Sequence, residues 1–488
     1  MLCKCKNVNF SNIMLKKVIF RTFAFLLICL AIIFTTKQRL YANALDLYGF
    51  GSRGPAMGNA YCAIAEGFSA VYYNPAGLSK IESIDAGVGF LSTENHFKPL
   101  KNIVLGADKD NPGILLTGNI KFDDNGATGM WGGFGASVTK KLSVGLGIFL
   151  PDSQYLAILK SQSQREPHYL NFENRPKRLS LLAGASLKLS EHLAVGVGAN
   201  ILYGPDGNVN ATISSQAESR VDLSLVFKPR ISPIFGILYN PSPALGFGLT
   251  YHGELYHGKL DLDVDGQMNM GTLNMPVLAQ MSSIIFNTPQ RISAGIAYTP
   301  TDSLTLAVEV AWKDWSSFND ASLGVNFNSG PGTIGTAELP EIDLQFEKVF
   351  SPNFKDTVVL GIGGEYRFGS FCPFEFLGDI DFNLRVGYTF EPTPIPDQNG
   401  LTNFLGSDRH IITFGTGVRA LDPFRTGKTI RMDLLFQLHI LEKKNVTKDK
   451  PYYDLDGDGI EETPVVGYPG YKISGNALVC GLTIGINF

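Results

Sequence analysis

Charged residues and cysteines are scarce in this chain of 488 residues. Only 18% of the residues are charged, whereas 44% are hydrophobic. This balance excludes an intrinsically disordered chain, which would be less apolar and more highly charged. Six cysteines are present, and only Cys62, Cys372 and Cys480 follow the first 44 residues. Three widely separated cysteines cannot form a disulfide framework.

Motifs for enzyme chemistry and nucleic-acid binding are also missing. The sequence has no P-loop, no Gly-x-Ser-x-Gly element and no paired cysteines, so we predict that the protein is not an enzyme. After residue 44 the chain has 34 basic and 45 acidic side chains, a net charge of −11. A surface of this sign does not favour nucleic acid as a partner.

Residues 1–44 have the features of an export signal. They contain seven basic and no acidic residues, and an apolar stretch spans 23–34. Ala42 and Ala44 place small side chains where signal peptidase requires them, so we predict cleavage after Ala44. An uncleaved anchor helix is the alternative, but the apolar stretch is short of the roughly 20 residues that cross a bilayer. Translation could start at Met1 or at Met14.

The rest of the chain alternates with a period of two residues, which is the period of β-strands. In the last segment, Leu478, Leu482 and Phe488 lie on one face, and small or polar residues such as Thr483 lie on the other. A soluble sandwich would turn the apolar face inward, whereas an outer-membrane barrel turns it toward lipid. Periodicity alone does not separate the two. The export signal and a terminal phenylalanine, which resembles the recognition signal of bacterial outer-membrane barrels, favour the barrel.

Loop lengths also favour a membrane barrel. Short turns alternate with long polar connections, as do the periplasmic turns and external loops of outer-membrane proteins. We therefore predict an all-β fold, a transmembrane antiparallel β-barrel over 84–488 in the bacterial outer membrane. The fourteen predicted strands are 84–95, 128–139, 142–150, 178–190, 192–203, 221–240, 244–257, 289–299, 303–317, 356–368, 381–391, 409–420, 429–442 and 474–488. The long connections are 96–127, 151–177, 204–220, 258–288, 318–355, 392–408 and 443–473.

Residues 45–83 do not have the strand pattern. They are rich in Gly and Ala and end in Asn74-Pro75-Ala76-Gly77, where Pro fixes φ and Asn caps a turn. Because the segment is too apolar to remain in the periplasm, we predict that it folds into the barrel as an N-terminal plug, or hatch.

This N-terminal segment resembles the FadL family of outer-membrane transporters for long-chain fatty acids and aromatic hydrocarbons. The resemblance rests on G-x-G-x-R-G, M-G-N-A-Y and S-A-V-Y-Y-N-P-A-G-L between 49 and 78, and on Trp312-Lys313-Asp314-Trp315-Ser316. It implies a fourteen-stranded barrel whose hatch is gated by Asn74, Pro75 and Ala76. It also implies capture of a hydrophobic ligand at an external groove, passage through a pocket in the barrel and lateral release, without an energy source. Pro151 either interrupts the third strand or ends it, and we favour the end.

Two further sets of residues are candidate sites. Arg385 and Arg431 lie among the charges predicted to face the lumen and could bind a carboxylate headgroup, although such charges often neutralise one another. Asp454, Asp456 and Asp458, with Gly459, resemble the start of a calcium loop, but Val465 stands where an EF-hand has Glu. A structural calcium ion and a solvated acidic loop are equally good interpretations, and no other cofactor is expected. Asp261, Asp263 and Asp265 have the same spacing, but apolar residues alternate with them, so we predict a strand there.

The leading functional prediction is passive uptake of hydrophobic small molecules, either fatty acids or aromatic hydrocarbons. An adhesin or receptor that acts through long external loops is the alternative from another class. A general porin is less favoured, because a plug would close its lumen. The expected partners are the hydrophobic ligand, outer-membrane lipid and lipopolysaccharide, with the protein itself a monomer.

Overall fold

The computed structural model describes most of the chain after residue 44. The described residues are 45–108, 110–122, 125–151, 164–169, 172, 179–214, 220–270, 273–318, 323–329, 332–334, 337–339, 342–347, 351, 353–372, 378–454 and 459–488. The predicted export signal, 1–44, lies outside them. None of the helices in this part of the chain is long and apolar enough to cross a membrane.

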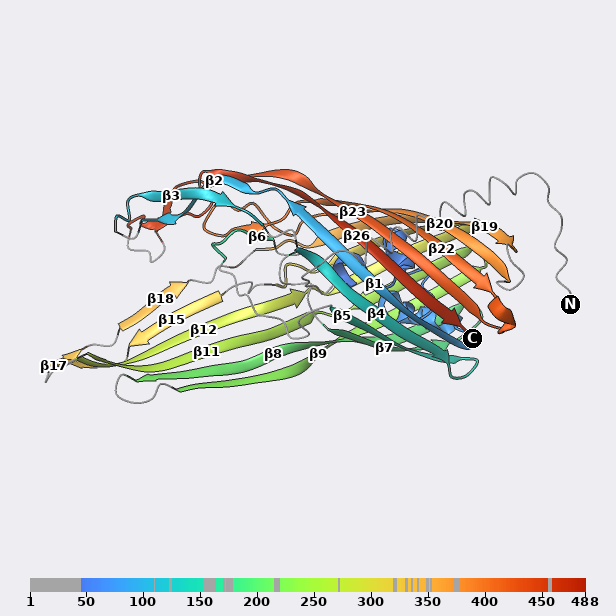
Figure 1. Ribbon diagram of the computed structural model, residues 1–488, viewed down its shortest axis with the longest axis horizontal. Helices are drawn as coiled ribbons and strands as arrows, with labels where there is room; N and C mark the ends of the chain where they lie inside the picture. The colour runs from blue at the N-terminus through green and yellow to red at the C-terminus, as the bar shows by residue number, and fades with distance from the viewer. Residues whose placement is uncertain are drawn as a thin grey trace.

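Fourteen antiparallel strands close into a barrel, which confirms the predicted fold class (Figure 1). The first strand pairs with the last, so that Asp85 lies opposite Asn487. Closure leaves no open edge and satisfies the backbone groups of the wall without water. In order around the wall, the strands are β1 (Ile84–Phe97), β4 (Asn125–Ser137), β5 (Leu142–Pro151), β7 (Ser180–Lys188), β8 (Leu193–Ser214), β9 (Arg220–Ser242), β10 (Leu245–His252), β13 (Arg291–Thr301), β14 (Leu304–Lys313), β19 (Thr357–Phe371), β20 (Asp379–Glu391), β22 (Arg409–Leu421), β23 (Thr429–Thr447) and β26 (Gly470–Asn487).

The period-two pattern of the sequence becomes an apolar outside and a mixed inside. Val88, Leu146 and Ile484 are 60%, 59% and 47% exposed on the outer face, whereas Asp85 and Thr483 are each 2% exposed on the inner face. Large apolar side chains that face outward are stable only when lipid covers them. The inner face carries the polar and charged groups that the N-terminal segment then covers.

Beyond the barrel, several of the predicted loops form strands. β8 and β9 continue outward as a long ribbon, and β11 (Leu255–Met270) joins β8 in parallel (Figure 1). Asp261, Asp263 and Asp265 lie in β11, as the alternation predicts, but 258–288 as a whole is a hairpin and 318–355 contains further strands. The additional strands are β2 (Leu100–Ala107), β3 (Leu115–Ile120), β6 (His168–Tyr169), β12 (Leu273–Thr288), β15 (Leu323–Ser329), β16 (Gly332–Ile334), β17 (Ala337–Leu339), β18 (Ile342–Glu347), β21 (Phe404–Leu405), β24 (Tyr452–Tyr453) and β25 (Thr463–Pro464). A short 3₁₀ helix, η3 (Pro423–Arg425), lies in the turn between β22 and β23.

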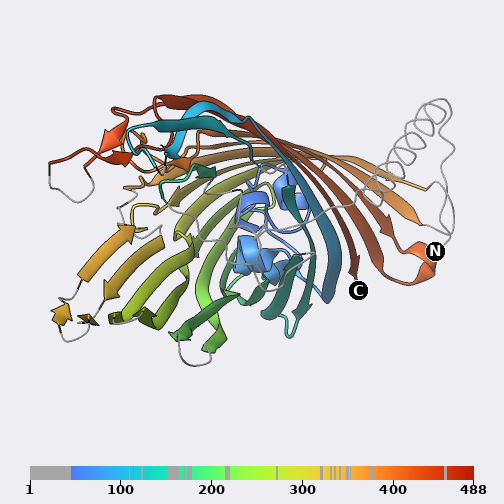
Figure 2. The same cartoon turned by 60° about the vertical axis from the view of Figure 1, so that its left-hand side comes forward.

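Residues 45–81 lie inside the barrel as a compact helical segment (Figure 2). Three single-turn α-helices, α2 (Leu45–Tyr48), α3 (Arg53–Ala56) and α4 (Ala70–Tyr73), lead to the 3₁₀ helix η1 (Pro75–Lys80). Phe50, Met57 and Val71 are completely buried. The segment therefore buries its apolar residues against the inner face of the barrel, and 45–81 is called the luminal segment below.

Candidate functional site

Inward-facing glycines line the wall where the luminal segment touches it. A Cβ atom on Gly196 of β8 would overlap the backbone between Pro75 and Ala76, and one on Gly236 of β9 would overlap the Asn74 side chain. Glycine is the residue that allows such close approach of one backbone to another. Other glycines in contact with the segment are Gly87, Gly133, Gly147, Gly184, Gly248, Gly295, Gly363, Gly387 and Gly415. These glycines give the inner face of the wall a surface without side chains, on which the luminal segment packs. This role of the glycines was not predicted from the sequence.

Asn74, Pro75 and Ala76 lie together against β8 and β9. The Asn74 Nδ2 donates to the carbonyl oxygens of Cys62, at 2.8 Å, and of Ile237 in β9, at 3.0 Å. Its Oδ1 accepts from the Ala76 backbone N–H at 3.1 Å and so begins η1. Asn74 is completely buried. This one amide therefore connects two parts of the luminal segment to the barrel wall.

Two wall carboxylates bind backbone N–H groups of the luminal segment. Glu309 of β14 accepts from the N–H groups of Tyr61 and Cys62, each at 2.9 Å. Asp85 of β1 accepts from the Phe68 N–H at 2.9 Å. The carboxylates provide acceptors for N–H groups in these short turns, although the Tyr61 N–H also donates to the Asn59 carbonyl. The segment is consequently fixed on opposite sides of the lumen.

A buried chain of ion pairs joins the segment to β19, β20 and β23 near their periplasmic ends. The Arg53 guanidinium donates to both oxygens of Glu365 at 2.9 Å and also pairs with Glu66. Arg385 donates to Glu365 and to Asp433, each at 2.6 Å. The Glu365 side chain is 6% exposed and that of Arg385 is 3% exposed, so little water competes for these pairs.

The predicted headgroup ligands both have carboxylate partners in this state. Arg385 lies in the chain of ion pairs, and Arg431 donates to Asp85 at 2.6 Å and to Asn487 Oδ1 at 2.8 Å. Both line a polar cavity of 200 Å³ below the luminal segment. Their role as headgroup ligands stays a prediction.

A second polar region lies at the external side of the luminal segment. Lys313 and Arg409 both pair with Glu391, and Arg291 donates to His252 at 3.0 Å and lies over the Tyr72 ring. These strands and the segment enclose a polar cavity of 60 Å³ that also contacts Asp46. The buried Arg291 Nε and Asp46 Oδ2 have no hydrogen-bond partner among the residues that the structure describes. From the sequence, Arg291 belongs to the stretch Thr288-Pro289-Gln290-Arg291-Ile292, which also resembles the FadL family. The sequence assigns it no role in a site, because its place beside His252 and Tyr72 depends on the pairing of strands.

Aromatic residues gather at the external mouth of the barrel. One cluster is formed by Trp315, Phe318, Phe354, Ile395 and Phe404. Trp315 belongs to the Trp-Lys-Asp-Trp-Ser element that the sequence analysis singled out. A second group stacks Phe97 on Tyr169 with ring centroids 4.1 Å apart and continues into the core around the luminal segment. These side chains are buried, so the aromatic residues pack against one another directly outside the polar region.

The connections at the mouth are tied together by one asparagine and one lysine. Asn403 is completely buried; its Nδ2 donates to the Arg165 and Val466 carbonyls, and its Oδ1 accepts from the Tyr471 hydroxyl. Lys448 donates to the Gly400 and Thr402 carbonyl oxygens, each at 2.7 Å. Burial lowers the pKa of Lys448 to about 7. Residues 392–408, 448 and 464–471 form a packed unit, called the external cap below.

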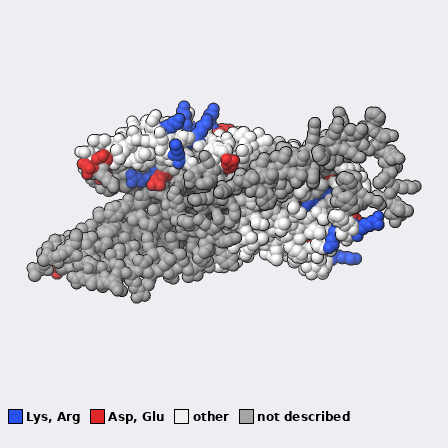
Figure 3. All heavy atoms as spheres, in the orientation of Figure 1, with Lys and Arg blue, Asp and Glu red and all other residues white. Residues whose placement is uncertain are grey.

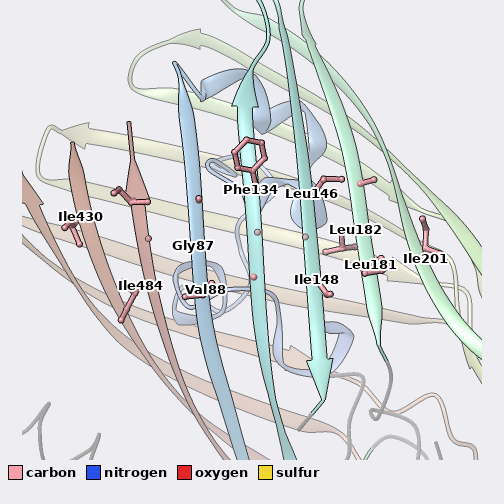
Figure 4. Close-up of a pocket in the computed structure, with 17 residues that line it drawn as sticks. Gly87, Val88, Phe134, Leu146, Ile148, Leu181, Leu182, Ile201, Ile430 and Ile484 are labelled. Atoms are coloured by element: carbon pink, nitrogen blue, oxygen red, sulfur yellow. The ribbon is translucent and has the colours of Figure 1, made fainter. Parts of the chain in front are cut away.

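The barrel wall is continuous along β5, the third wall strand, which contains Pro151. β5 pairs with β4 as far as Pro151, and with β7 from Leu142 to Phe149. Pro151 ends β5, as favoured from the sequence. On the outer face, small residues leave an apolar groove of 870 Å³ that extends from Ile430 of β23 to Ile201 of β8 and is lined by Phe134 and Leu146 between them (Figure 4). The position of a lateral opening stays a prediction.

The predicted calcium loop is only partly described. Asp454 accepts from the Gly459 N–H at 3.0 Å, whereas Asp456 and Asp458 lie outside the described residues. Among the described residues no group of three or more His, Cys, Asp or Glu side chains is placed to hold a metal ion. Calcium binding is therefore untested.

Comparison with known proteins relates the whole barrel to one family. A family model described as outer membrane protein transport protein (OMPP1/FadL/TodX) matches residues 33–488. The alkane uptake protein A of Marinobacter nauticus is 20% identical over 417 residues, which cover 80% of this chain and 82% of that protein. The long-chain fatty acid transport protein of Escherichia coli O157:H7 is 24% identical over 222 residues, 45% of this chain and 37% of that protein. The crystal structure of the Pseudomonas putida toluene transporter TodX shares the fold, with a TM-score of 0.50 and 13% identity over 93% of this chain and 100% of that chain.

Proposed function

This chain belongs to the outer-membrane protein transport family that includes FadL and TodX, and we propose that it takes up hydrophobic small molecules through a lumen gated by residues 45–81. The family consists of transport proteins of the bacterial outer membrane for hydrophobic substrates, so the chain is a transporter and not an enzyme. The adhesin alternative is not favoured. The ligand class, the gate and the exit route are parts of the proposal.

The observation that carries the proposal is the way in which the luminal segment fills the barrel. Besides its apolar contacts with the inner face, the segment is bound to the wall by hydrogen bonds and ion pairs from Glu309, Asp85 and Glu365. Contacts of this kind can be exchanged for water when the segment moves, at a smaller cost than that of exposing a large apolar surface. Such a segment is suited to act as a hatch, with Asn74, Pro75 and Ala76 as its contact with the wall.

We infer that the aromatic mouth captures the ligand when its packed rings separate. Trp315, Phe354 and Phe404 pack together beside the external cap. An apolar ligand gains roughly 25 cal/mol for each Å² that it removes from water, so binding there needs no energy source. Relatives are named for alkane, fatty acid and toluene transport. A long-chain hydrocarbon, with or without a carboxylate, fits the proposal best, because the lysine and arginines at the external polar region would attract a carboxylate entering from the mouth.

Uptake experiments test the proposal directly. Radiolabelled oleate, hexadecane and toluene are supplied to a strain that lacks its own transporter, with and without this protein. We expect uptake of at least one compound to depend on the protein. Replacing Asn74 and Pro75 with Ala removes the amide that connects the segment to β9 and the ring against β8, and we expect the rate to change severalfold.

Ser79→Ala is the matched control. Its hydroxyl lies in the same 3₁₀ helix but donates only to the Ala76 carbonyl, so uptake should stay at the wild-type rate. If none of the three compounds enters through a folded, surface-exposed barrel, the proposed ligand class is wrong. If the Asn74 and Pro75 variants transport at the wild-type rate, the proposed gate is wrong.

A further inference from the structure

A row of lysines crosses three adjacent strands on the outer face of the barrel, beyond the apolar band. Lys443 lies in β23 and Lys472 in β26, and Lys98 directly follows β1. Lys472 pairs in register with Asn445, two residues from Lys443, and the Lys98 N–H donates to Ser474, two residues from Lys472. Because adjacent strands lie about 4.8 Å apart, the three ammonium groups are neighbours. They are called the lysine row below.

The lysine row points away from the protein core. Phe97, Tyr471 and Ile473 flank Lys98 and Lys472 in the chain and are buried. Lys443 lies where the register of β23 shifts, between Leu441 and Lys444, and Lys98, Lys443 and Lys472 are all exposed. Basic side chains gather on this side of the molecule, above β2 and the outer parts of β23 and β26 (Figure 3). The position does not overlap the luminal segment or the aromatic mouth.

Acidic side chains nearby are engaged with histidines rather than with the lysine row. Glu442 lies 2.6 Å from His410, whose other ring nitrogen bonds the Tyr388 hydroxyl. Glu94 lies 3.7 Å from His96. None of the three lysines has an ion pair with a residue that the structure describes. The three lysines outnumber these two glutamates, so the row is a local excess of positive charge on a protein that is acidic after residue 44.

The distance of the lysine row from the membrane can be measured from the apolar band on the outer face of the wall. On the outer face of β26, Leu478 is still 44% exposed, and the polar residues Asn476 and Ser474 separate it from Lys472. Six residues of strand rise about 20 Å, and a tilt near 40° reduces this to roughly 15 Å above the band. Extended lysine side chains reach several ångströms back toward the membrane. The row thus lies at the level of a large lipid headgroup.

From charge, height and direction, we propose that the lysine row binds the phosphate groups of the glycolipid that forms the outer leaflet of the outer membrane. Basic clusters next to an apolar surface bind anionic lipid through the sum of several weak attractions. Three neighbouring ammonium groups match a headgroup with more than one phosphate. The inference rests on the outer-membrane location and not on the transported ligand.

Binding of purified lipopolysaccharide to the full-length protein in neutral detergent tests the proposal. The triple variant K98Q, K443Q and K472Q should bind the phosphorylated glycolipid roughly a hundredfold more weakly, as expected for the loss of three basic groups near an anionic surface. The double variant K140Q and K141Q is the control, because these exposed lysines lie in the turn between β4 and β5 at the other end of the barrel. It should bind like the wild type. Equal melting temperatures without lipid establish that the variants are folded.

Three results would overturn the proposal. The first is equal affinity for the phosphorylated and the enzymatically dephosphorylated glycolipid. The second is equal weakening by the two sets of substitutions, which would indicate a general charge effect. The third is full competition by millimolar inorganic phosphate, which would indicate a free-anion site. A variant that loses lipid binding but still transports would separate this inference from the proposed function.

Discussion

Glu365 is the residue on which the buried ion pairs of the lumen depend. It accepts both Arg53, from the luminal segment, and Arg385, from the neighbouring strand. Removing one partner of a buried pair leaves charge without compensation, which usually costs more than the pair itself contributes. Because Arg53 keeps Glu66 and Arg385 keeps Asp433, part of the cost is relieved.

Glu365→Gln should therefore destabilise the barrel by about 2 kcal/mol, somewhat below the cost for a fully isolated buried charge. Guanidinium unfolding in detergent, followed by tryptophan fluorescence, measures the change. Glu191→Gln is the control, because Glu191 pairs with Lys188 on an exposed turn, where an ion pair contributes little. A loss of equal size in both variants would contradict the assignment of the buried chain.

The inward direction of these charges could be predicted from sequence, but their partners could not. Alternation placed Arg385 and Arg431 on the luminal face. The register between strands then decides which charges meet, and it places Glu365 directly opposite Arg385. The partners Arg53 and Asp85 depend in addition on the path of the luminal segment. The sequence therefore identified candidate residues of the site but not their hydrogen-bond and ion-pair partners.

At the scale of elements, the external cap contains a lysine that titrates near neutral pH. Lys448 is 2% exposed, and burial lowers its pKa from the ordinary 10.5 to about 7. At pH values between about 7 and 10.5, Lys448 is protonated in the opened cap but not in the packed cap. The free energy of opening therefore rises with pH from about 7 to 10 and is constant below 7, where both states are protonated.

Amide hydrogen exchange measures this opening. The Phe404 N–H donates to Gln398, and the His168 N–H to the Asn403 carbonyl. We expect their protection, corrected for intrinsic exchange, to increase between pH 7 and pH 9. Lys448→Met removes the titrating group and should abolish the increase. Lys450→Met, at an exposed position, should leave it unchanged, and a pH response that survives Lys448→Met would show that another group is responsible.

All fourteen wall strands were predictable because each has one lipid-facing and one luminal side. Of the external strands, part of β11 was predicted from the alternation around Asp261, Asp263 and Asp265, whereas β12 and β15 were missed. Strands outside the membrane band do not need a continuous apolar face toward lipid, so their sequences need not alternate regularly. The luminal segment was recognised as an exception to the strand pattern. The glycines of the wall that contact this segment were not recognised. A glycine that faces inward has no side chain that would distinguish it, in the sequence, from a glycine in a turn.

At the scale of the whole molecule, the main question is whether the luminal segment must move for transport. The Ser52 and Thr483 hydroxyl oxygens lie 2.8 Å apart and connect the segment to β26. Cysteines at these two positions would bring their sulfur atoms close enough for a disulfide. A variant with Ser52→Cys and Thr483→Cys, in which Cys62, Cys372 and Cys480 are replaced by Ala, can thus be locked and released.

If the segment leaves its seat on β26 during each passage, oxidation should stop most of the uptake and a reductant should restore it. The two single cysteine variants should respond to neither treatment, which controls for effects of the reagents. Wild-type uptake by the oxidised double variant would mean that ligand passes with the segment still joined to β26, through a rearrangement near β8 and β9 alone. Because Asn74 and Pro75 contact β8 and β9, substitutions at these two residues would then still alter uptake by the oxidised protein. If the whole segment must move, the oxidised protein should show little uptake whether or not Asn74 and Pro75 are replaced.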